Sequence, residues 1–140
     1  MNFLRSVKRL PTADELIERF PLSREARSQV EQDRDEVRAI LGGTDERMLF
    51  VVGPCKAWPE QAVLEYAERL LPLEGTVREA LKLVLRVYIQ KPRTARGWTG
   101  PVNQPDPFAP ADVEAGMIYC RRMMVRVVEM GLAIADEALF

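Results

Sequence analysis

The chain carries a group of cationic side chains in and just after one apolar stretch, LRVYIQKPRTARGW, which begins at Leu85. Arg86 falls inside the apolar run, and Lys91, Arg93 and Arg96 follow it among proline and glycine residues. Arginine binds carboxylate or phosphate groups through two parallel hydrogen bonds, and lysine acts as a point charge. The grouping therefore predicts a site for a small metabolite that carries several negative charges.

Arg86 is predicted to lie on an interior face of a strand. In KLVLRVYI, the odd-numbered residues of 83–89 form one apolar face, whereas Arg86 and Tyr88 fall on the other face. An unpaired guanidinium on an interior surface costs several kcal/mol, so Arg86 needs an anion. The anion that pairs with Arg86 could be a carboxylate of the protein or a bound substrate. The nearness of Lys91 and Arg93 favours the substrate.

Cys55 is the second candidate for chemistry, because it ends the motif GPC directly after an apolar run, Met48–Val52. A thiol at a strand end suits metal binding, although a cysteine with only a packing role is also possible. Cys120 lies among apolar residues of an expected helix and is interpreted as core. The chain has no histidine, so it lacks the commonest general base and transition-metal ligand.

The elements that would position these residues alternate between helix and strand. Thr12 and Glu15 have the spacing of a capping box, and Gly42 and Gly43 mark the end of a charge-rich second helix whose charges are interpreted as a solvated face. The run Met48–Val52 has the pattern of a strand buried on both faces. The expected elements are helices in 11–21 and 23–41, a strand at 48–52, a helix in 59–71, a strand at 82–89, a helix in 111–131 and a strand in 132–140.

This order of elements predicts an α/β fold with a parallel sheet and right-handed crossovers. Functional groups in such sheets gather where strands end. Cys55 and the loop of about twenty residues after the second strand both have that position. Long loops in compact domains are often functional. Five prolines stiffen this one: Pro92, Pro101, Pro105, Pro107 and Pro110.

The composition is that of one globular domain of 140 residues, 47% hydrophobic and 29% charged. Lys and Arg total 20 against 21 Asp and Glu, a net charge of −1, which favours neither nucleic acid nor an anionic membrane as a partner. No apolar run reaches the length of a membrane span, and the first residues lack a signal-peptide pattern. We therefore expect a cytoplasmic protein with reduced cysteines.

Four segments carry a resemblance: LPTADELIERFP, GGTDERMLFVV, VVGPC and, one helix later, LRVYIQKPRTARGWTGPVN. Together they resemble the N-terminal part of a known enzyme family. The family is the type I 3-deoxy-D-arabino-heptulosonate 7-phosphate synthases, also called phospho-2-dehydro-3-deoxyheptonate aldolases, and the similarity runs from about Leu10 to Phe140. It implies a metal-dependent (β/α)8 barrel that condenses phosphoenolpyruvate with erythrose 4-phosphate in the shikimate pathway. It also suggests a homo-oligomer.

The resemblance implies roles for particular residues. Cys55 matches the thiolate ligand of a divalent metal ion such as manganese, iron or cobalt. Arg86 and Lys91 match positions that bind phosphoenolpyruvate, with Lys91 also implied as catalytic. The segment that would hold erythrose 4-phosphate consists of Lys91, Pro92, Arg93 and Thr94. Gly97 and Trp98 are interpreted as residues that shape the loop.

The sequence also departs from the family. After GPC the family commonly has Ser and then His two residues later, whereas Lys56, Ala57 and Trp58 stand here. A (β/α)8 barrel needs roughly 200 residues at minimum and typically has about 250, and this chain has three expected strands. The remaining ligands, a His, a Glu and an Asp, come from later strands in the family. A metal site usually takes three or four protein ligands, so we do not expect this chain alone to hold the ion.

Two functions are therefore open. In the first, residues 1–44 are an N-terminal helical extension and residues 45–140 are the first strands and helices of an incomplete (β/α)8 barrel of a truncated synthase. In the second, the chain is a noncatalytic barrel fragment that associates with another chain, for example through the edge of its third strand or its N-terminal helices. An open apolar edge favours aggregation, which makes the second function less attractive.

Overall fold

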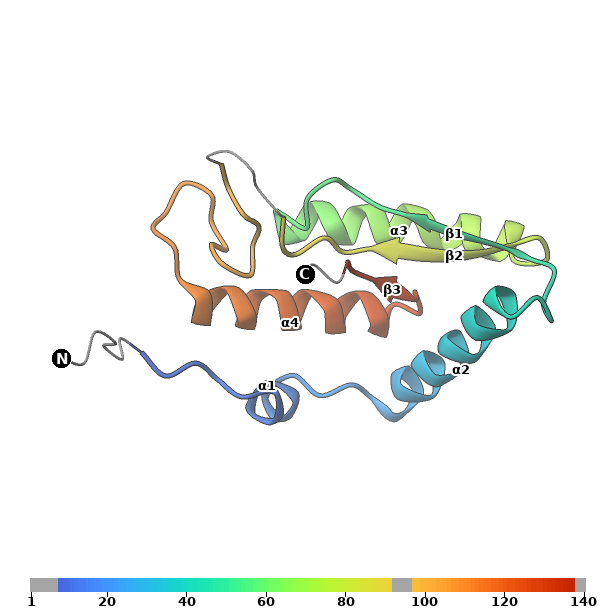
Figure 1. Cartoon of the computed structure of the whole chain (residues 1–140), viewed down its shortest axis with the longest axis horizontal. Coiled ribbons are helices and arrows are strands. Elements are labelled where there is room, and N and C mark those ends of the chain that lie inside the picture. The colour runs from blue at the N-terminus through green and yellow to red at the C-terminus, as the bar shows by residue number, and fades with distance from the viewer. Residues whose placement is uncertain (1–7, 92–96, 138–140) are drawn as a thin grey trace.

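The computed structural model describes residues 8–91 and 97–137, and it shows helices packed against a small parallel sheet (Figure 1). In chain order the elements are α1 (Ala13–Arg19), α2 (Arg24–Leu41), β1 (Met48–Val52), α3 (Glu60–Val77), β2 (Leu81–Arg86), α4 (Val113–Glu129) and β3 (Ile134–Ala135). The predicted order of helices and strands is thus confirmed.

The sheet has the order β1-β2-β3, and both strand pairs are parallel. Met48 is the register partner of Leu81, and Leu85 is the partner of Ile134. The second strand ends at Arg86 rather than at the predicted residue 89, and the third strand is only two residues long. Since all three strands run the same way, their carboxyl ends lie at one edge of the sheet, beside the long loop (Figure 1).

Three of the described helices, α1, α2 and α4, begin at residues whose side chains cap them. Thr12 and Glu15 form the predicted capping box, the Ser23 side chain caps α2, and the Asp112 side chain caps α4. The third helix runs through Pro72 to Val77, beyond the predicted end at residue 71. Proline removes one backbone hydrogen bond from a helix, but the surrounding residues still pack, so the helix continues.

One face of the sheet forms the main core with α3 and α4. Leu83, Leu85 and Val87 alternate onto this face, as predicted, and each is at most 5% exposed. Full burial of one such side chain stabilises the fold by about 1.5–3 kcal/mol. The helices contribute Val63, Leu64, Ala67, Leu70, Met123 and Val127.

The other face of β2 meets α2. The Lys82 ammonium lies 2.5 Å from the Asp33 carboxylate and 3.0 Å from that of Glu36. Both Lys82 and Asp33 are buried. The interpretation of the α2 charges as a solvated face is therefore wrong for this side of the helix, because Asp33 and Glu36 bind a cation of the sheet.

The prediction that β1 is buried on both faces is also wrong. Met48 is 63% exposed, Phe50 is 48% exposed and Val51 is 47% exposed. The physical reason is that β1 is an edge strand of the described sheet, with β2 as its only neighbour. The apolar run therefore predicted the strand correctly but its burial wrongly.

Candidate anion site at the carboxyl ends of the strands

The turn after β1 is built directly on Arg86. A Cβ atom at Gly53 would lie 2.4 Å from the backbone oxygen of Arg86, so only glycine fits at this position. The Arg86 guanidinium, through Nη2, donates to the carbonyl oxygens of Gly53 at 3.3 Å and Pro54 at 3.4 Å. Cys55 follows at once. Arg86 therefore supports the backbone that carries the candidate metal ligand.

The Arg86 guanidinium retains capacity for a further partner. Its Nε is buried and has no hydrogen-bond partner in the described part of the chain. No ion pair joins Arg86 to a carboxylate among residues 8–91 and 97–137. The described residues therefore do not support the alternative in which a protein carboxylate neutralises Arg86. A buried donor without a partner is costly, which makes Arg86 the candidate residue for binding an anion.

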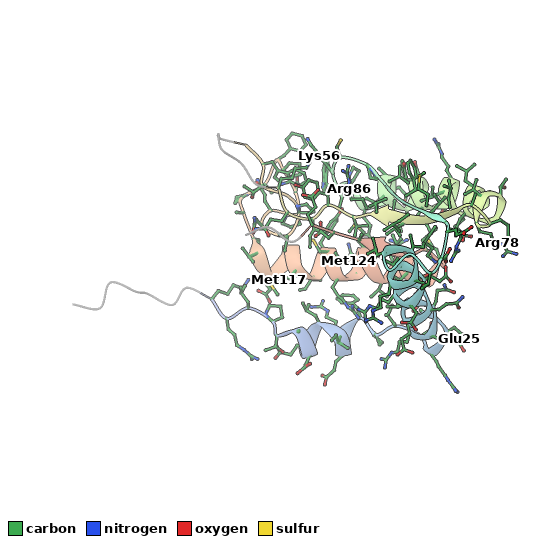
Figure 2. All side chains as sticks on the ribbon, turned by 45° about the vertical axis from the view of Figure 1, so that its right-hand side comes forward. Glu25, Lys56, Arg78, Arg86, Met117 and Met124 are labelled. Atoms are coloured by element: carbon green, nitrogen blue, oxygen red, sulfur yellow. The ribbon has the colours of Figure 1, made fainter. Side chains whose placement is uncertain are left out.

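Lys91 and Arg86 converge on the ring of Tyr88. The Lys91 ammonium lies 4.5 Å from the ring centroid, and the Arg86 guanidinium carbon lies 5.7 Å from it. Burial and the nearby carboxylates of Glu137 and Asp136 raise the pKa of the Tyr88 hydroxyl. The two predicted cations are thus brought together at one strand end. Figure 2 shows Arg86 and Lys56 at this end of the sheet and Arg78 at the opposite end.

Cys55 is a free, exposed thiol at the same edge of the sheet. Within the described residues no three His, Cys, Asp or Glu side chains are grouped so that they could hold a metal ion. The residues present thus supply one candidate ligand and do not by themselves fit a complete metal centre. The other cysteine, Cys120, is buried in α4, and burial raises the pKa of its thiol to about 12, which agrees with its interpretation as core.

The predicted erythrose 4-phosphate segment is described only at Lys91, since Pro92, Arg93 and Thr94 lie outside the described residues. The part of the loop that follows is folded on itself. The Trp98 indole N–H donates to the Gln104 carbonyl at 2.8 Å, and the Gln104 amide donates to the Ala109 carbonyl at 2.6 Å. These contacts support the view that Trp98 shapes the loop.

Three residues of this strand-end region received no role from the sequence. Tyr88 was recognised only as a neighbour of Arg86 on the same face, and Asp136 and Glu137 were not considered. The two acids directly follow β3. The rule that functional groups follow parallel strands, applied to the third strand as it was to the first two, would have identified them.

A parallel sheet packed with helices, with an arginine and a lysine close together at the carboxyl ends of its strands, makes this an α/β protein with a candidate anion site. Residues 20–139 match the DAHP synthetase I family. This match covers most of the chain, and the chain belongs to that family.

Known relatives agree with this assignment. The chain is 43% identical over 130 residues to the Tyr-sensitive phospho-2-dehydro-3-deoxyheptonate aldolase of Salmonella typhimurium, which covers 93% of this chain and 36% of that protein. It is 39% identical to the aldolase of Corynebacterium glutamicum, with the same coverage. The solved structure of the aldolase from Francisella tularensis SCHU S4 matches with a TM-score of 0.92 and 33% identity, over 97% of this chain and 40% of that one. The chain thus spans little more than a third of the length of the relatives it matches.

None of the helices in the described part of the chain combines the length and the apolar character that crossing a membrane requires.

Proposed function

We propose that this chain is the N-terminal portion of a 3-deoxy-7-phosphoheptulonate synthase, which condenses phosphoenolpyruvate with erythrose 4-phosphate. In that reaction carbon 3 of phosphoenolpyruvate bonds to the aldehyde carbon of erythrose 4-phosphate, water adds at carbon 2, and phosphate leaves. The observation that carries the proposal is the buried Arg86 Nε without a partner in the described residues, beside Lys91, in a chain of this family.

The described cations suit the first substrate. Phosphoenolpyruvate carries a carboxylate and a phosphate, and Arg86 and Lys91 offer a fork of donors and a point charge at one strand end. We assign these two residues to phosphoenolpyruvate, with Lys91 in direct contact with the reacting molecule. Their contribution is to neutralise charge and to orient the substrate. By resemblance, Pro92, Arg93 and Thr94 would hold erythrose 4-phosphate together with Lys91.

The fold and the metal belong to the same proposal. Three parallel strands with α3 and α4 packed on one face are what the first part of a (β/α)8 barrel would contain. In that arrangement residues 1–44 are the helical extension and residues 45–140 begin the barrel. Cys55 would supply one ligand to a divalent metal ion, and the remaining ligands would come from later strands of a longer protein. By resemblance alone we further propose a cytoplasmic, homo-oligomeric protein.

A chimera tests the proposal directly. This chain replaces the matching N-terminal portion of the Salmonella typhimurium relative, and turnover is followed as loss of phosphoenolpyruvate absorbance with erythrose 4-phosphate and manganese. We expect turnover that falls at least ~100-fold in Arg86→Met, since a charged partner of the substrate is lost. Cys55→Ala should nearly abolish turnover.

Arg78→Met is the matched control, because Arg78 is exposed and lies at the opposite end of the sheet (Figure 2). Its chimera should turn over like the unmodified one. A folded chimera without activity, or one whose activity survives Arg86→Met, would contradict the proposal. The isolated chain is expected to show no turnover, because the described residues offer one metal ligand.

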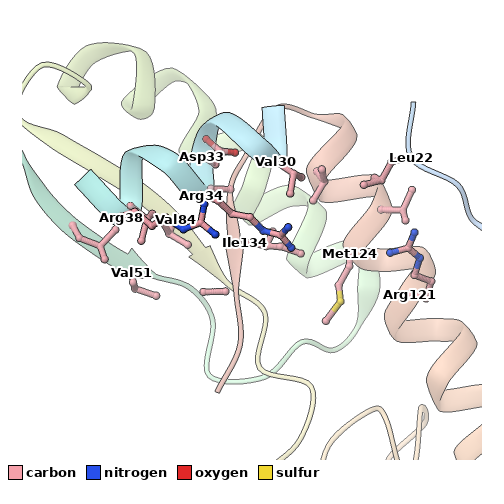
Figure 3. A pocket seen from close by; sticks show the side chains of 16 residues that line it. Leu22, Val30, Asp33, Arg34, Arg38, Val51, Val84, Arg121, Met124 and Ile134 are labelled. Atoms are coloured by element: carbon pink, nitrogen blue, oxygen red, sulfur yellow. The ribbon is translucent and has the colours of Figure 1, made fainter. Parts of the chain in front are cut away.

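A specific observation also favours the second function, association with another chain. Both β1 and β3 are outermost strands of the described sheet, each with one hydrogen-bonded neighbour, and β1 exposes Met48, Phe50 and Val51. Beside β1 lies an open, mainly apolar groove of about 590 Å³ between α2, the sheet and α4 (Figure 3), with Val30, Val51, Val84 and Met124 among its lining residues. Sedimentation of the isolated chain at several concentrations tests this function. A monomer at all of them would argue against self-association.

A further inference from the structure

The segment that follows Cys55 passes between the end of β2 and α4. Ala57 has no exposed surface, and its backbone N–H donates to the Tyr88 carbonyl at 3.3 Å. The Ala57 carbonyl accepts a hydrogen bond from the Tyr119 hydroxyl at 2.9 Å. The backbone on either side of Ala57 is therefore held in place, and its neighbours Lys56 and Trp58 are aimed at the long loop.

The two side chains that flank Ala57 contact aromatic residues of that loop. The Trp58 ring meets Trp98 edge to face at a centroid distance of 6.3 Å and Phe108 at 6.1 Å. The Lys56 ammonium lies 5.7 Å from the Trp98 ring centroid. We call these four residues, Lys56, Trp58, Trp98 and Phe108, the tryptophan clasp. It joins the turn after β1 to the loop after β2.

The clasp connects to Lys91 through the backbone. Thr99, next to Trp98, accepts a hydrogen bond from the Lys91 N–H at 2.7 Å. Gly100, at φ +108, packs so closely that a Cβ atom there would lie 2.3 Å from the Ile89 carbonyl oxygen. A displacement of Trp98 therefore moves Thr99, and Thr99 fixes the backbone of Lys91.

The geometry points to Trp58 as a positioning residue for the anion site. By holding Trp98, Trp58 fixes the distance between the turn that carries Cys55 and the backbone that carries Lys91. Within the described residues the ring contacts of Trp58 are with Trp98 and Phe108, which we assign to no substrate, so Trp58 acts through Trp98 and Thr99. This inference rests on the proposed function, because it assigns to Trp58 control over how tightly phosphoenolpyruvate binds between Arg86 and Lys91.

The chain provides its own signal for this test. It contains two tryptophans, Trp58 and Trp98, and both are in the clasp, so tryptophan emission reports on the clasp alone. Phosphoenolpyruvate is titrated into the 140-residue chain, with affinity measured by calorimetry and clasp geometry by emission. We expect a saturable change of emission with the same midpoint as the heat signal. Arg86→Met should remove both signals, and Arg78→Met should leave both unchanged.

Variants of the tryptophan clasp then test whether Trp58 positions the anion site or only packs against the loop. Trp58→Leu keeps an apolar side chain but removes the ring contacts, and it should weaken phosphoenolpyruvate binding roughly 5-fold, in line with the value of an aromatic pair. Trp58→Phe keeps a ring and should restore binding to within about 2-fold of the unmodified chain. Phe108→Ala, at a side chain that is 88% exposed, should weaken binding about 2-fold without unfolding the chain.

The outcomes distinguish the two claims. If the unmodified chain binds phosphoenolpyruvate and depends on Arg86, but folded Trp58→Leu binds equally well, the positioning role is wrong and the proposed function stands. If Trp58→Leu fails to fold, Phe108→Ala decides, and unchanged affinity there rejects the positioning role. If the unmodified chain shows no binding at all, both the anion site and the role of Trp58 are wrong.

Discussion

Lys82 and Arg86 lie on the same face of β2, four positions apart, yet only Lys82 has carboxylate partners among the described residues. Lys82 is enclosed by Asp33 and Glu36 of α2 at the start of the strand. Among the described residues the Arg86 guanidinium donates to the Gly53 and Pro54 carbonyls at the strand end and lies near the Tyr88 ring, and its Nε has no hydrogen-bond partner there. One strand thus carries a cation paired with two carboxylates of the fold and a cation that is our candidate for binding an anion.

Loss of the Lys82 charge should destabilise the chain without affecting the anion site directly. Lys82→Met leaves the buried Asp33 carboxylate without its partner, which costs about 3–5 kcal/mol of the free energy of unfolding. Urea unfolding measures the change. The double variant Lys82→Met with Asp33→Leu should recover most of the stability, because it leaves no unpaired buried charge. A loss under about 1 kcal/mol in the single variant would show that the pair contributes little.

Stability should fall in acid through Glu36. Burial opposes ionisation of this carboxyl, but hydrogen bonds from Lys82 and Arg47 outweigh it and lower the pKa below its ordinary value of 4.5. A lowered folded pKa means that the stabilisation is complete above pH 4.5 and is lost as the pH falls through the folded value.

The measurement is urea unfolding between neutral pH and pH 3 for the unmodified chain and Glu36→Gln. The unmodified chain should lose more stability on acidification than the variant does. Equal losses in the two proteins would mean that Glu36 is not a source of the acid sensitivity.

Gly53→Ala should disturb the turn before Cys55. The added Cβ would lie 2.4 Å from the Arg86 carbonyl oxygen and 3.0 Å from the Arg86 nitrogen, so the turn or the strand has to shift. We expect a loss of about 1–3 kcal/mol in the free energy of unfolding and weaker phosphoenolpyruvate binding.

Gly75→Ala is the matched control for that prediction. Gly75 lies in α3, and an added Cβ there would meet nothing within 4 Å. Alanine favours a helix over glycine by up to about 1 kcal/mol, so this variant should be neutral or more stable. If the two variants behave alike, the close approach of Gly53 to Arg86 has no energetic consequence.

The two thiols should differ in reactivity. Cys55 is exposed, whereas burial of Cys120 raises its pKa to about 12. The thiolate is the reactive form, so at neutral pH a thiol reagent should modify one cysteine per folded chain and both after unfolding. Mass spectrometry of the modified chain identifies the residue. Rapid modification of Cys120 in the folded chain would contradict the packing of α4.

Local patterns predicted the elements well because their causes are local. The capping box of Thr12 and Glu15 spans four residues, and the alternation of Leu83, Leu85 and Val87 is set by the strand itself. The exposure of Phe50 depends instead on what lies beside β1, which no pattern within the strand encodes. Burial was therefore predicted correctly for the central strand and wrongly for an edge strand.

The sequence predicted the cations of the candidate site but not the contacts that surround them. Arg86 and Lys91 stood out because charged residues close to an apolar strand are unusual, and the strand-end rule brought them together. The contact of Trp58 with Trp98 joins two loops that are far apart in sequence, and the pairing of Lys82 with Asp33 spans 49 residues. Periodicity and capping carry no information about contacts of that range.

The separation of Asp33 from Lys82 also sets an order of events during synthesis. Helix α2 is complete on the ribosome before Lys82 has been translated, so during that interval the Asp33 carboxylate has the Gln29 amide beside it but not its Lys82 partner. In proteins most of the stability of a helix such as α2 comes from tertiary packing of one face. We therefore expect α2 to dock only once the second strand is present, on the unit formed by β1, α3 and β2.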